Sequence, residues 1–152
     1  MPPIPEGLSR ARWLWIRMIT RGQPIRFVYH PPTYPADLRV IRMYDAEGYD
    51  IGRLVWQICD ACHHGTINQI SLSDSWQRHG IGRLLINRAL RDGPGYRWTT
   101  SSQSPQAKRF FPVMTTETGA AFTERAKVCP HIRGRRHTPC HRRPTPILAR
   151  DV

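Results

Sequence analysis

The sequence has no apolar run of about 18 residues, the length that a helix needs to cross a membrane. Its N-terminal stretch also lacks the basic start, apolar segment and small-residue cleavage site of a secretory signal peptide. We therefore expect no membrane partner and a cytoplasmic location. At 152 residues the chain is long enough for one domain with its own core.

Acidic residues are scarce, since 11 Asp and Glu stand against 23 Lys and Arg, and the formal net charge is +12. Half of this excess lies in residues 124–152, which are also rich in proline. A basic, proline-rich segment is typical of a solvated chain that contacts polyanions without recognising a base sequence. We therefore expect no nucleic-acid partner beyond non-specific contact through this segment.

Cysteines are few, and the four present are expected to be reduced or metal-bound in the cytoplasm. Cys59 and Cys62 form a C-x-x-C pair in the connection between two predicted strands, and Cys129 and His131 offer two further ligands. This set predicts a structural zinc site, with free structural cysteines and redox chemistry as the alternatives. Further residues of ligand type are His63, His64, His137, Cys140 and His141.

Apolar periodicity predicts the order of the elements. After a first helix and four strands come a helix, a strand and a helix, which predicts an α/β layer fold with a mostly antiparallel sheet ending in a parallel crossover. Ser9 and Ser104 are predicted to cap their helices, and Pro112 to kink or shorten one. The predicted strands are 25–30, 38–45, 51–59, 65–72 and 96–103, and the predicted helices are 9–20, 81–91 and 104–119.

Two glycines, Gly80 and Gly82, stand one residue apart where the predicted helix 81–91 begins. Glycine permits a tight turn there, and it lets an anion approach backbone N–H groups that have no partner within the helix. Arg78 and Arg83 flank the turn and could pair with phosphate oxygens. The residues alone leave two interpretations open: an anion site, or close packing of the helix on the sheet.

The segment Q-R-H-G-I-G, residues 77–82, fits the Q/R-x-x-G-x-G/A signature of the GCN5-related (GNAT) acyltransferases. A later segment resembles the family's N-x-x-A-x-x-Φ-Y pattern and its closing G-F. Its residues are Ser104, Ala107, Phe110, Phe111 and the T-G-A-A-F stretch at 118–122. The resemblance covers residues 38–122. It implies a GNAT-like mixed, mostly antiparallel twisted sheet flanked by helices, and N-acetyl transfer from acetyl-CoA to a primary amine by direct attack in a ternary complex.

The resemblance also assigns the cofactor site. The backbone of Ile70 and Leu72 would pair with the pantetheine arm, and residues 77–83 would hold the pyrophosphate. Ser104 stands where the family often has an asparagine that contacts CoA. The expected cofactor-binding residues are Ile70, Leu72, Gln77, Arg78, His79, Gly80, Ile81, Gly82, Arg83 and Ser104.

The catalytic residues are not assigned, because Phe111 stands where many relatives carry a tyrosine that protonates the leaving thiolate. Phenylalanine cannot donate a proton, so another group must do so if the chain is an enzyme. The candidates are His79, Glu117 and Tyr96, with Asp74 and Ser101 as further ones.

Two other functions stay open. Phe111 favours a non-catalytic acyl-CoA-binding or regulatory module, and the basic charge admits a zinc-stabilised nucleic-acid-binding protein whose binding would be lost without residues 124–152. The chain before residue 36 is shorter than the family's usual N-terminal region, which helps to form the acceptor pocket. The resemblance therefore does not identify the amine acceptor, and a homodimer could complete the pocket. The expected regions are a helix and strand lead-in at 1–35, an acyl-CoA-binding core at 36–123, and a C-terminal segment at 124–152 that the metal site would clip.

Overall fold

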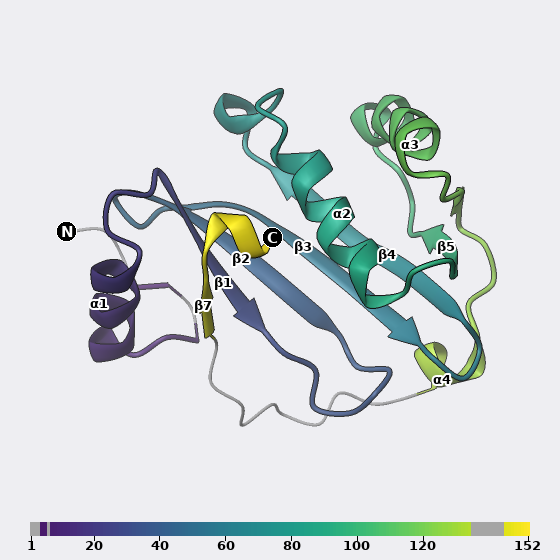
Figure 1. The fold of residues 1–152 in the computed structure, drawn as a ribbon, viewed down its shortest axis with the longest axis horizontal. Helices are drawn as coiled ribbons and strands as arrows, with labels where there is room; N and C mark the ends of the chain where they lie inside the picture. The colour runs from purple at the N-terminus through teal and green to yellow at the C-terminus, as the bar shows by residue number, and fades with distance from the viewer. Residues whose placement is uncertain (1–3, 6, 135–144) are drawn as a thin grey trace.

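The computed structural model describes residues 4, 5, 7–134 and 145–152, and among them seven strands form one sheet in the order β6-β5-β4-β3-β2-β1-β7 (Figure 1). The strands are β1 Ile25–His30, β2 Arg39–Asp45, β3 Asp50–Cys59, β4 His64–Leu72, β5 Arg97–Thr100, β6 Phe122–Glu124 and β7 Thr145–Ile147. The helices are α1 Arg10–Ile19, α2 Ile81–Asp92, α3 Pro105–Thr118 and α4 Pro130–Arg133, with 3-10 turns at Asp74–Trp76 and Ala149–Asp151.

The four strands β1 to β4 form an antiparallel meander. The chain then crosses over through α2 and returns as β5, which lies parallel to β4, and β6 lies parallel to β5. A parallel neighbour needs such a crossover because a tight hairpin can join only antiparallel strands. The predicted fold class, a mixed and mostly antiparallel sheet flanked by helices, is confirmed.

The two faces of the sheet are covered by different helices. Phe27 and Met43 belong to the main core, together with residues of α2 and α3, whereas their neighbours Val28 and Tyr44 pack with α1. Successive side chains of a strand point to opposite faces. The helix α1 therefore lies on the face opposite α2 and α3, and both faces of β1 and β2 are buried.

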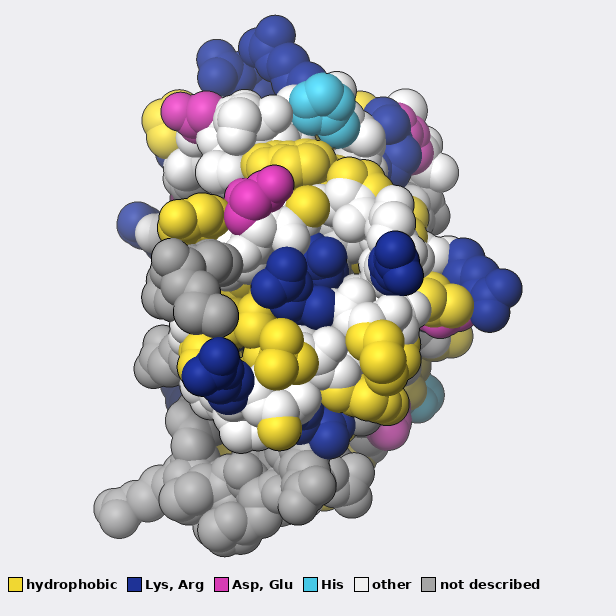
Figure 2. Space-filling view, turned by 90° about the vertical axis from the view of Figure 1, so that its left-hand side faces the viewer, with side chains coloured by type: hydrophobic (Ala, Val, Ile, Leu, Met, Phe, Trp, Pro, Cys, Tyr) yellow, Lys and Arg dark blue, Asp and Glu magenta, His cyan; other side chains and the backbone are white. Residues whose placement is uncertain are grey.

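The outer side of α1 carries apolar side chains next to arginines (Figure 2). Trp13 and Ile16 are buried against the sheet, while Leu14, Trp15 and Met18 are exposed. This division follows from the helical period, which places only one stripe of α1 on the sheet. Within the described ranges, no helix is both long enough and apolar enough to cross a membrane.

Both predicted helix caps are confirmed. The Ser9 hydroxyl accepts a hydrogen bond from the Arg12 N–H at 3.3 Å, and the Ser104 hydroxyl accepts one from the Ala107 N–H at 3.2 Å. Of the two predicted effects of Pro112, a kink or a shortened helix, the second is wrong, since α3 continues to Thr118. Pro112 is exposed, so water can solvate the carbonyl that its missing N–H leaves without a helical partner.

The chain beyond Phe122, where the sequence predicts no regular element, folds onto both edges of the sheet. The strand β6 pairs with β5 at one edge, and β7 pairs with β1 at the other, where Pro146 lies opposite Val28. Proline is compatible with β7 because an edge strand needs hydrogen-bond donors on one side only. The described parts of residues 124–152 thus include short regular elements, whereas most of the basic, proline-rich stretch 133–146 lies outside the described residues.

Candidate functional site

The strands β4 and β5 pair along only part of their length. Their register ends at Ile67 and Thr100, where the Ser101 N–H donates to the Ile67 carbonyl at 3.0 Å and the Ser101 hydroxyl donates to the Asn68 carbonyl at 2.6 Å. The strand β4 continues to Leu72 against β3 alone. Ser101 therefore marks the point at which the two strands part, and the second half of β4 has an open edge toward β5.

A β-bulge in β4 lies at the same place. Val55 of β3 is opposite Gln69 and Trp56 is opposite Ile67, so Asn68 is the extra residue. The bulge explains why two successive carbonyls, those of Ile67 and Asn68, both face Ser101 instead of alternating. It also increases the local twist of β4, which turns its second half away from β5.

Backbone groups of Ile70 and Leu72 face the open edge. The Ser73 N–H donates to the Ile51 carbonyl on β3 at 2.8 Å, and residues along a strand direct their backbone groups to alternate edges. Leu72 and Ile70, one and three residues before Ser73, therefore point away from β3. These are the two residues that the resemblance pairs with a pantetheine arm.

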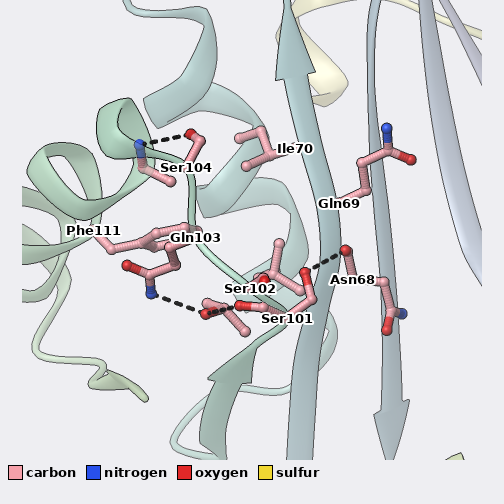
Figure 3. A pocket seen from close by; sticks show the side chains of 11 residues that line it. Asn68, Gln69, Ile70, Ser101, Ser102, Gln103, Ser104 and Phe111 are labelled. Carbon is pink, nitrogen blue, oxygen red and sulfur yellow. Dashed lines mark hydrogen bonds between the residues drawn. The ribbon is translucent and has the colours of Figure 1, made fainter. Parts of the chain in front are cut away.

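A cleft of about 150 Å³ lies between the parted strands (Figure 3). The open edge of β4 forms one wall, and the chain from Thr100 into the first turn of α3 forms the other. Its lining residues are Ile67, Asn68, Gln69, Ile70, Thr100, Ser101, Ser102, Gln103, Ser104, Ala107 and Phe111. None of these described lining residues carries a side chain that titrates near neutral pH.

The turn between β4 and α2 is held by Gln77. Its side-chain amide donates to the Leu72 carbonyl at 2.9 Å and to the Asp74 carboxylate at 3.1 Å. Arg78 and Gly80 then adopt left-handed backbone conformations, with φ of 62° and 78°. No side chain caps α2, so the first N–H groups of the helix are open to an anion.

The two glycines of the turn have different roles. Gly80 adopts a positive φ that other residues rarely tolerate, and a Cβ placed there would lie in open space. A Cβ on Gly82 would lie 3.3 Å from the ring of Phe110 on α3. Gly80 thus shapes the turn and leaves its outer side accessible, whereas Gly82 permits close packing of α2 on α3.

Arg83 is engaged across the two helices by Glu117. The guanidinium donates two hydrogen bonds, of 2.6 and 2.7 Å, to the carboxylate of Glu117 on α3. This pair lowers the pKa of Glu117, and it raises the pKa of Arg83. Arg83 is therefore bound to an acidic side chain, and a phosphate would compete with Glu117 for it.

The structure does not bring the three catalytic candidates together in one site. His79 lies in the turn with its ring edge-on to Trp76, and Glu117 is the ion-pair partner of Arg83. Tyr96 precedes β5, and its hydroxyl donates to Asp60 at 2.7 Å, at the end of β4 and β5 opposite the cleft. Tyr96 thus does not line the cleft, and the three residues do not form one site.

Phe111 lies at the cleft with its ring in the core. It is 3% exposed and packs against Phe110 and Phe122, with ring centroids 5.4 and 5.0 Å away. Ser104, at the N-terminus of α3, also lines the cleft. The position at which the resembled family often has a tyrosine therefore faces the cleft, but in this chain it presents an aromatic ring without a hydroxyl.

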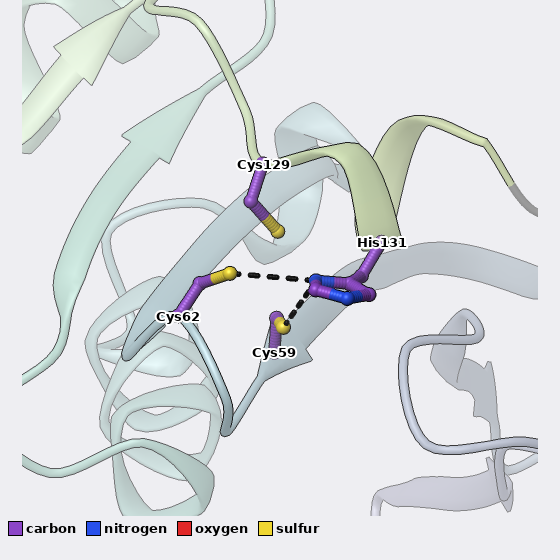
Figure 4. Close-up of side chains that lie close together, drawn as sticks. All are labelled: Cys59, Cys62, Cys129 and His131. Carbon is purple, nitrogen blue, oxygen red and sulfur yellow. Dashed lines mark hydrogen bonds between the residues drawn. The ribbon is translucent and has the colours of Figure 1, made fainter.

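The four predicted metal ligands come together at the other end of β4 (Figure 4). Their ligand atoms all lie within 4.8 Å of one another, and the His131 Nδ1 is 3.5 Å from the Cys59 Sγ and 3.4 Å from the Cys62 Sγ. Cys59 and Cys129 are buried, whereas Cys62 is exposed. The residues His137, Cys140 and His141 lie outside the described part of the chain.

The thiols of this cluster perturb one another. A hydrogen bond with Cys59, burial, and contacts with Cys129 raise the pKa of Cys62 to about 11. Burial opposes ionisation of Cys129, but hydrogen bonds from the Ile132 backbone and from the neighbouring thiols outweigh it and lower the pKa of Cys129.

His64, a spare ligand in the sequence, has another role. It is fully buried, its Nδ1 accepts a hydrogen bond from the Cys129 N–H at 3.3 Å, and its Nε2 lies 3.2 Å from the Thr99 hydroxyl. Burial lowers the pKa of His64, and the nearby Arg97 adds to this effect. The neutral ring thus joins the cysteine cluster to β5, a link that the sequence does not reveal.

No protein-family model matches the sequence, and no curated protein matches it. Several solved structures are similar, and three of them are described as acetyltransferases. A proposed acetyltransferase from Deinococcus radiodurans R1 is 18% identical, with a TM-score of 0.47 over 83% of this chain and 84% of its own. Aminoglycoside N-acetyltransferase AAC(6′)-Iy in complex with CoA is 22% identical, with a TM-score of 0.42 over 64% of this chain and 68% of its own. Nourseothricin acetyltransferase is 16% identical, with a TM-score of 0.33 over 55% of this chain and 62% of its own.

Proposed function

We propose that this chain is a GNAT-type acyltransferase that binds acetyl-CoA and transfers its acetyl group to a primary amine. The observation that carries the proposal is the open edge of β4 beside the cleft, with the uncapped start of α2 beyond its end. An extended chain of amides can add to such an edge as a further strand would, and a helix N-terminus attracts a phosphate. One ligand with both features, an amide arm and a pyrophosphate, matches this arrangement.

The backbone supplies most of the proposed contacts. The N–H and carbonyl of Ile70 and the N–H of Leu72 would pair with the pantetheine amides, since the Leu72 carbonyl already accepts from Gln77. The N–H groups at the start of α2 would bind the pyrophosphate, and Arg78 and Arg83 would supply charge. Binding therefore depends on backbone geometry more than on the identity of the lining side chains.

The proposed reaction is direct attack. The amine nitrogen forms a bond to the thioester carbonyl carbon, the C–S bond breaks, and the CoA thiolate takes up a proton. Proximity in a ternary complex supplies much of the rate, and a backbone N–H at the open edge would stabilise the developing oxyanion. Because no described lining side chain titrates near neutral pH, the proton of the ammonium group would leave through water or hydroxyls such as that of Ser101.

A second candidate is a non-catalytic acyl-CoA-binding module. The buried ring of Phe111 and the lack of a titratable side chain among the described lining residues favour it. Both candidates require the same CoA site, so turnover is the measurement that separates them. Binding of CoA by calorimetry without acetyl transfer to any of a panel of primary amines would select the binding module.

Hydrogen exchange tests the site itself. Saturating CoA should protect the amides of Ile70 and Leu72, which face the open edge, and those at the start of α2. The amides of Gln69 and Ser71, which face β3, are the internal control and should change little. Protection confined to other strands, or no binding of CoA, would contradict the proposed function.

A further inference from the structure

Four side chains of metal-ligand type converge from two distant parts of the chain. Cys59 ends β3 and Cys62 lies in the turn before β4, while Cys129 and His131 frame the start of α4. We propose that these four residues bind one Zn²⁺ ion, which fastens the C-terminal segment to the β3–β4 hairpin. The proposal is independent of the acyltransferase assignment, because none of the four residues lines the cleft.

The spacing of the ligand atoms fits a tetrahedral site. With Zn–S near 2.3 Å and Zn–N near 2.05 Å, a tetrahedron has S···N edges of about 3.6 Å. The His131 Nδ1 lies 3.5 and 3.4 Å from the sulfurs of Cys59 and Cys62. The sulfur of Cys129 completes the group within the same 4.8 Å limit. Two of the six separations thus match those of a tetrahedral zinc site, and the other four lie within 4.8 Å.

The ligand set identifies the class of metal and its role. Three thiolates and one imidazole are soft and borderline ligands, which favour Zn²⁺ over Mg²⁺ or Ca²⁺. Four protein ligands leave no open position for water or substrate, which is the pattern of a structural site and not of a catalytic one. The metal would therefore contribute to folding and not to bond breaking.

The surroundings of the cluster explain why a metal is needed there. The helix α4 has four residues, and its one buried apolar side chain, Ile132, packs in a small cluster with Ala36, Cys59 and Cys129. Such a cluster buries little apolar surface, and a helix of one turn is not stable alone. A metal bridge between residues 59–62 and 129–131 would close a long loop of chain, which gives it a large effect on the unfolded state.

The site also supports the paired end of β4 and β5. The Cys129 N–H donates to His64, whose other ring nitrogen lies within hydrogen-bond distance of Thr99 on β5. Fixing Cys129 therefore fixes the contact at which β4 and β5 run together, far from the point where they part at Ser101. Loss of the metal should loosen this end of the sheet first.

Metal content and stability of the full-length protein test the proposal. Protein purified under reducing conditions should hold one Zn²⁺ per chain, and a strong chelator should lower the melting temperature by roughly 10 °C or more. Cys129→Ser and His131→Ala should each weaken Zn²⁺ binding at least about tenfold. Cys140→Ser is the control, because Cys140 is not one of the four proposed ligands, and this variant should retain the metal.

Cobalt substitution keeps the test decisive where a variant fails to fold. Co²⁺ in a tetrahedral site with thiolate ligands absorbs strongly in the visible and gives sulfur-to-metal charge-transfer bands, so the wild-type protein should show both. A wild-type protein that binds neither Zn²⁺ nor Co²⁺ would overturn the proposal. So would a Cys59–Cys62 disulfide in the freshly prepared protein, or loss of metal in Cys140→Ser equal to that in Cys129→Ser.

Discussion

The strand β4 has a different kind of candidate site at each end. At its start, four side chains from the β3–β4 hairpin and the start of α4 gather their ligand atoms within 4.8 Å. At its finish, a cleft of about 150 Å³ is framed by backbone groups, a turn and side chains without titratable groups. The first site depends on which side chains are present, and the second depends on where two strands part. The two sites should therefore respond to different changes in the protein.

Removal of the proposed zinc ion is the change with the largest expected effect and the most direct test of this independence. Chelation should lower the melting temperature by roughly 10 °C or more, while the dissociation constant for CoA, measured well below that temperature, should change by less than about twofold. Differential scanning calorimetry and titration calorimetry on the same samples give both values. A parallel loss of CoA affinity would show that the two ends of β4 are coupled.

Substitution of Gly80 tests the cleft end alone. Gly80→Val puts a β-branched residue at a φ of 78°, which should cost about 1–2 kcal/mol of folding free energy and reduce CoA affinity about tenfold or more. Gly80→Asn tolerates this backbone and should remain stable, but its side chain would obstruct the anion.

The control for Gly80 is Gly95, which also has a positive φ of 73° and open space at its Cβ. Gly95 precedes β5 at the other end of the sheet, so Gly95→Val should cost similar stability and leave CoA binding unchanged. If the variants at the two positions bind CoA equally, the turn before α2 does not hold the cofactor.

Phe111→Tyr distinguishes an enzyme from a binding module. The new hydroxyl would face the cleft, where a proton donor raises the rate at which the thiolate leaves, so kcat should rise about tenfold with little change in the KM for acetyl-CoA. Phe110→Tyr is the matched control, because Phe110 is not among the cleft-lining residues. An unchanged kcat would place the reacting thioester away from residue 111.

Glu117→Gln should have the smallest effect. It releases Arg83 from its ion pair, so CoA should bind about twofold more tightly at low salt, and the gain should fade as salt is added. Glu47→Gln changes the net charge equally at a turn between β2 and β3, and it should have no effect. Weaker binding in Glu117→Gln would indicate that Glu117 positions Arg83 for the phosphate.

The same ion pair gives the protein a pH dependence. Because the folded state holds the pKa of Glu117 below its usual value, the pair stabilises the folded state above the usual pKa. That contribution is lost as the pH falls through the lowered pKa that Glu117 has in the folded state. Glu117→Gln removes the contribution at every pH. Thermal melts of both proteins across this acidic range measure the difference.

The elements that are long enough to show a periodic pattern of apolar residues were predictable from the sequence. The strands at 25–30 and 65–72 and the helices beginning after Ser9 and Ser104 follow the predictions within a residue or two. Short elements were not, because α4 has four residues and β7 three, too few for any period to show. The predicted strand 96–103 is shortened because Ser101 bonds to the last paired carbonyls and the chain then turns into α3.

The predicted ligand cluster and the predicted cofactor residues fared differently. The metal-binding chemistry of the cluster lies in its side chains, so residue type and spacing were enough to predict it. Its residues are Cys59, Cys62, Cys129 and His131. The pairing of Arg83 with Glu117 depends on the packing of α2 on α3, which no local pattern reveals. The bulge at Asn68 is likewise a property of two strands together and leaves no mark in either one alone.

The bulge at Asn68 also gives the cleft a length scale. Between the point where Ser101 closes the paired strands and the end of β4 lie residues 69–72, which at about 3.3 Å each span about 13 Å. A ligand whose phosphates bind beyond Leu72 would extend along these residues, and the hydroxyl of Ser101 lies at the far end of this stretch. If acetyl-CoA binds as proposed, a donor with a longer acyl chain would reach Ser101, so the number of residues after the bulge would limit the size of the transferred group.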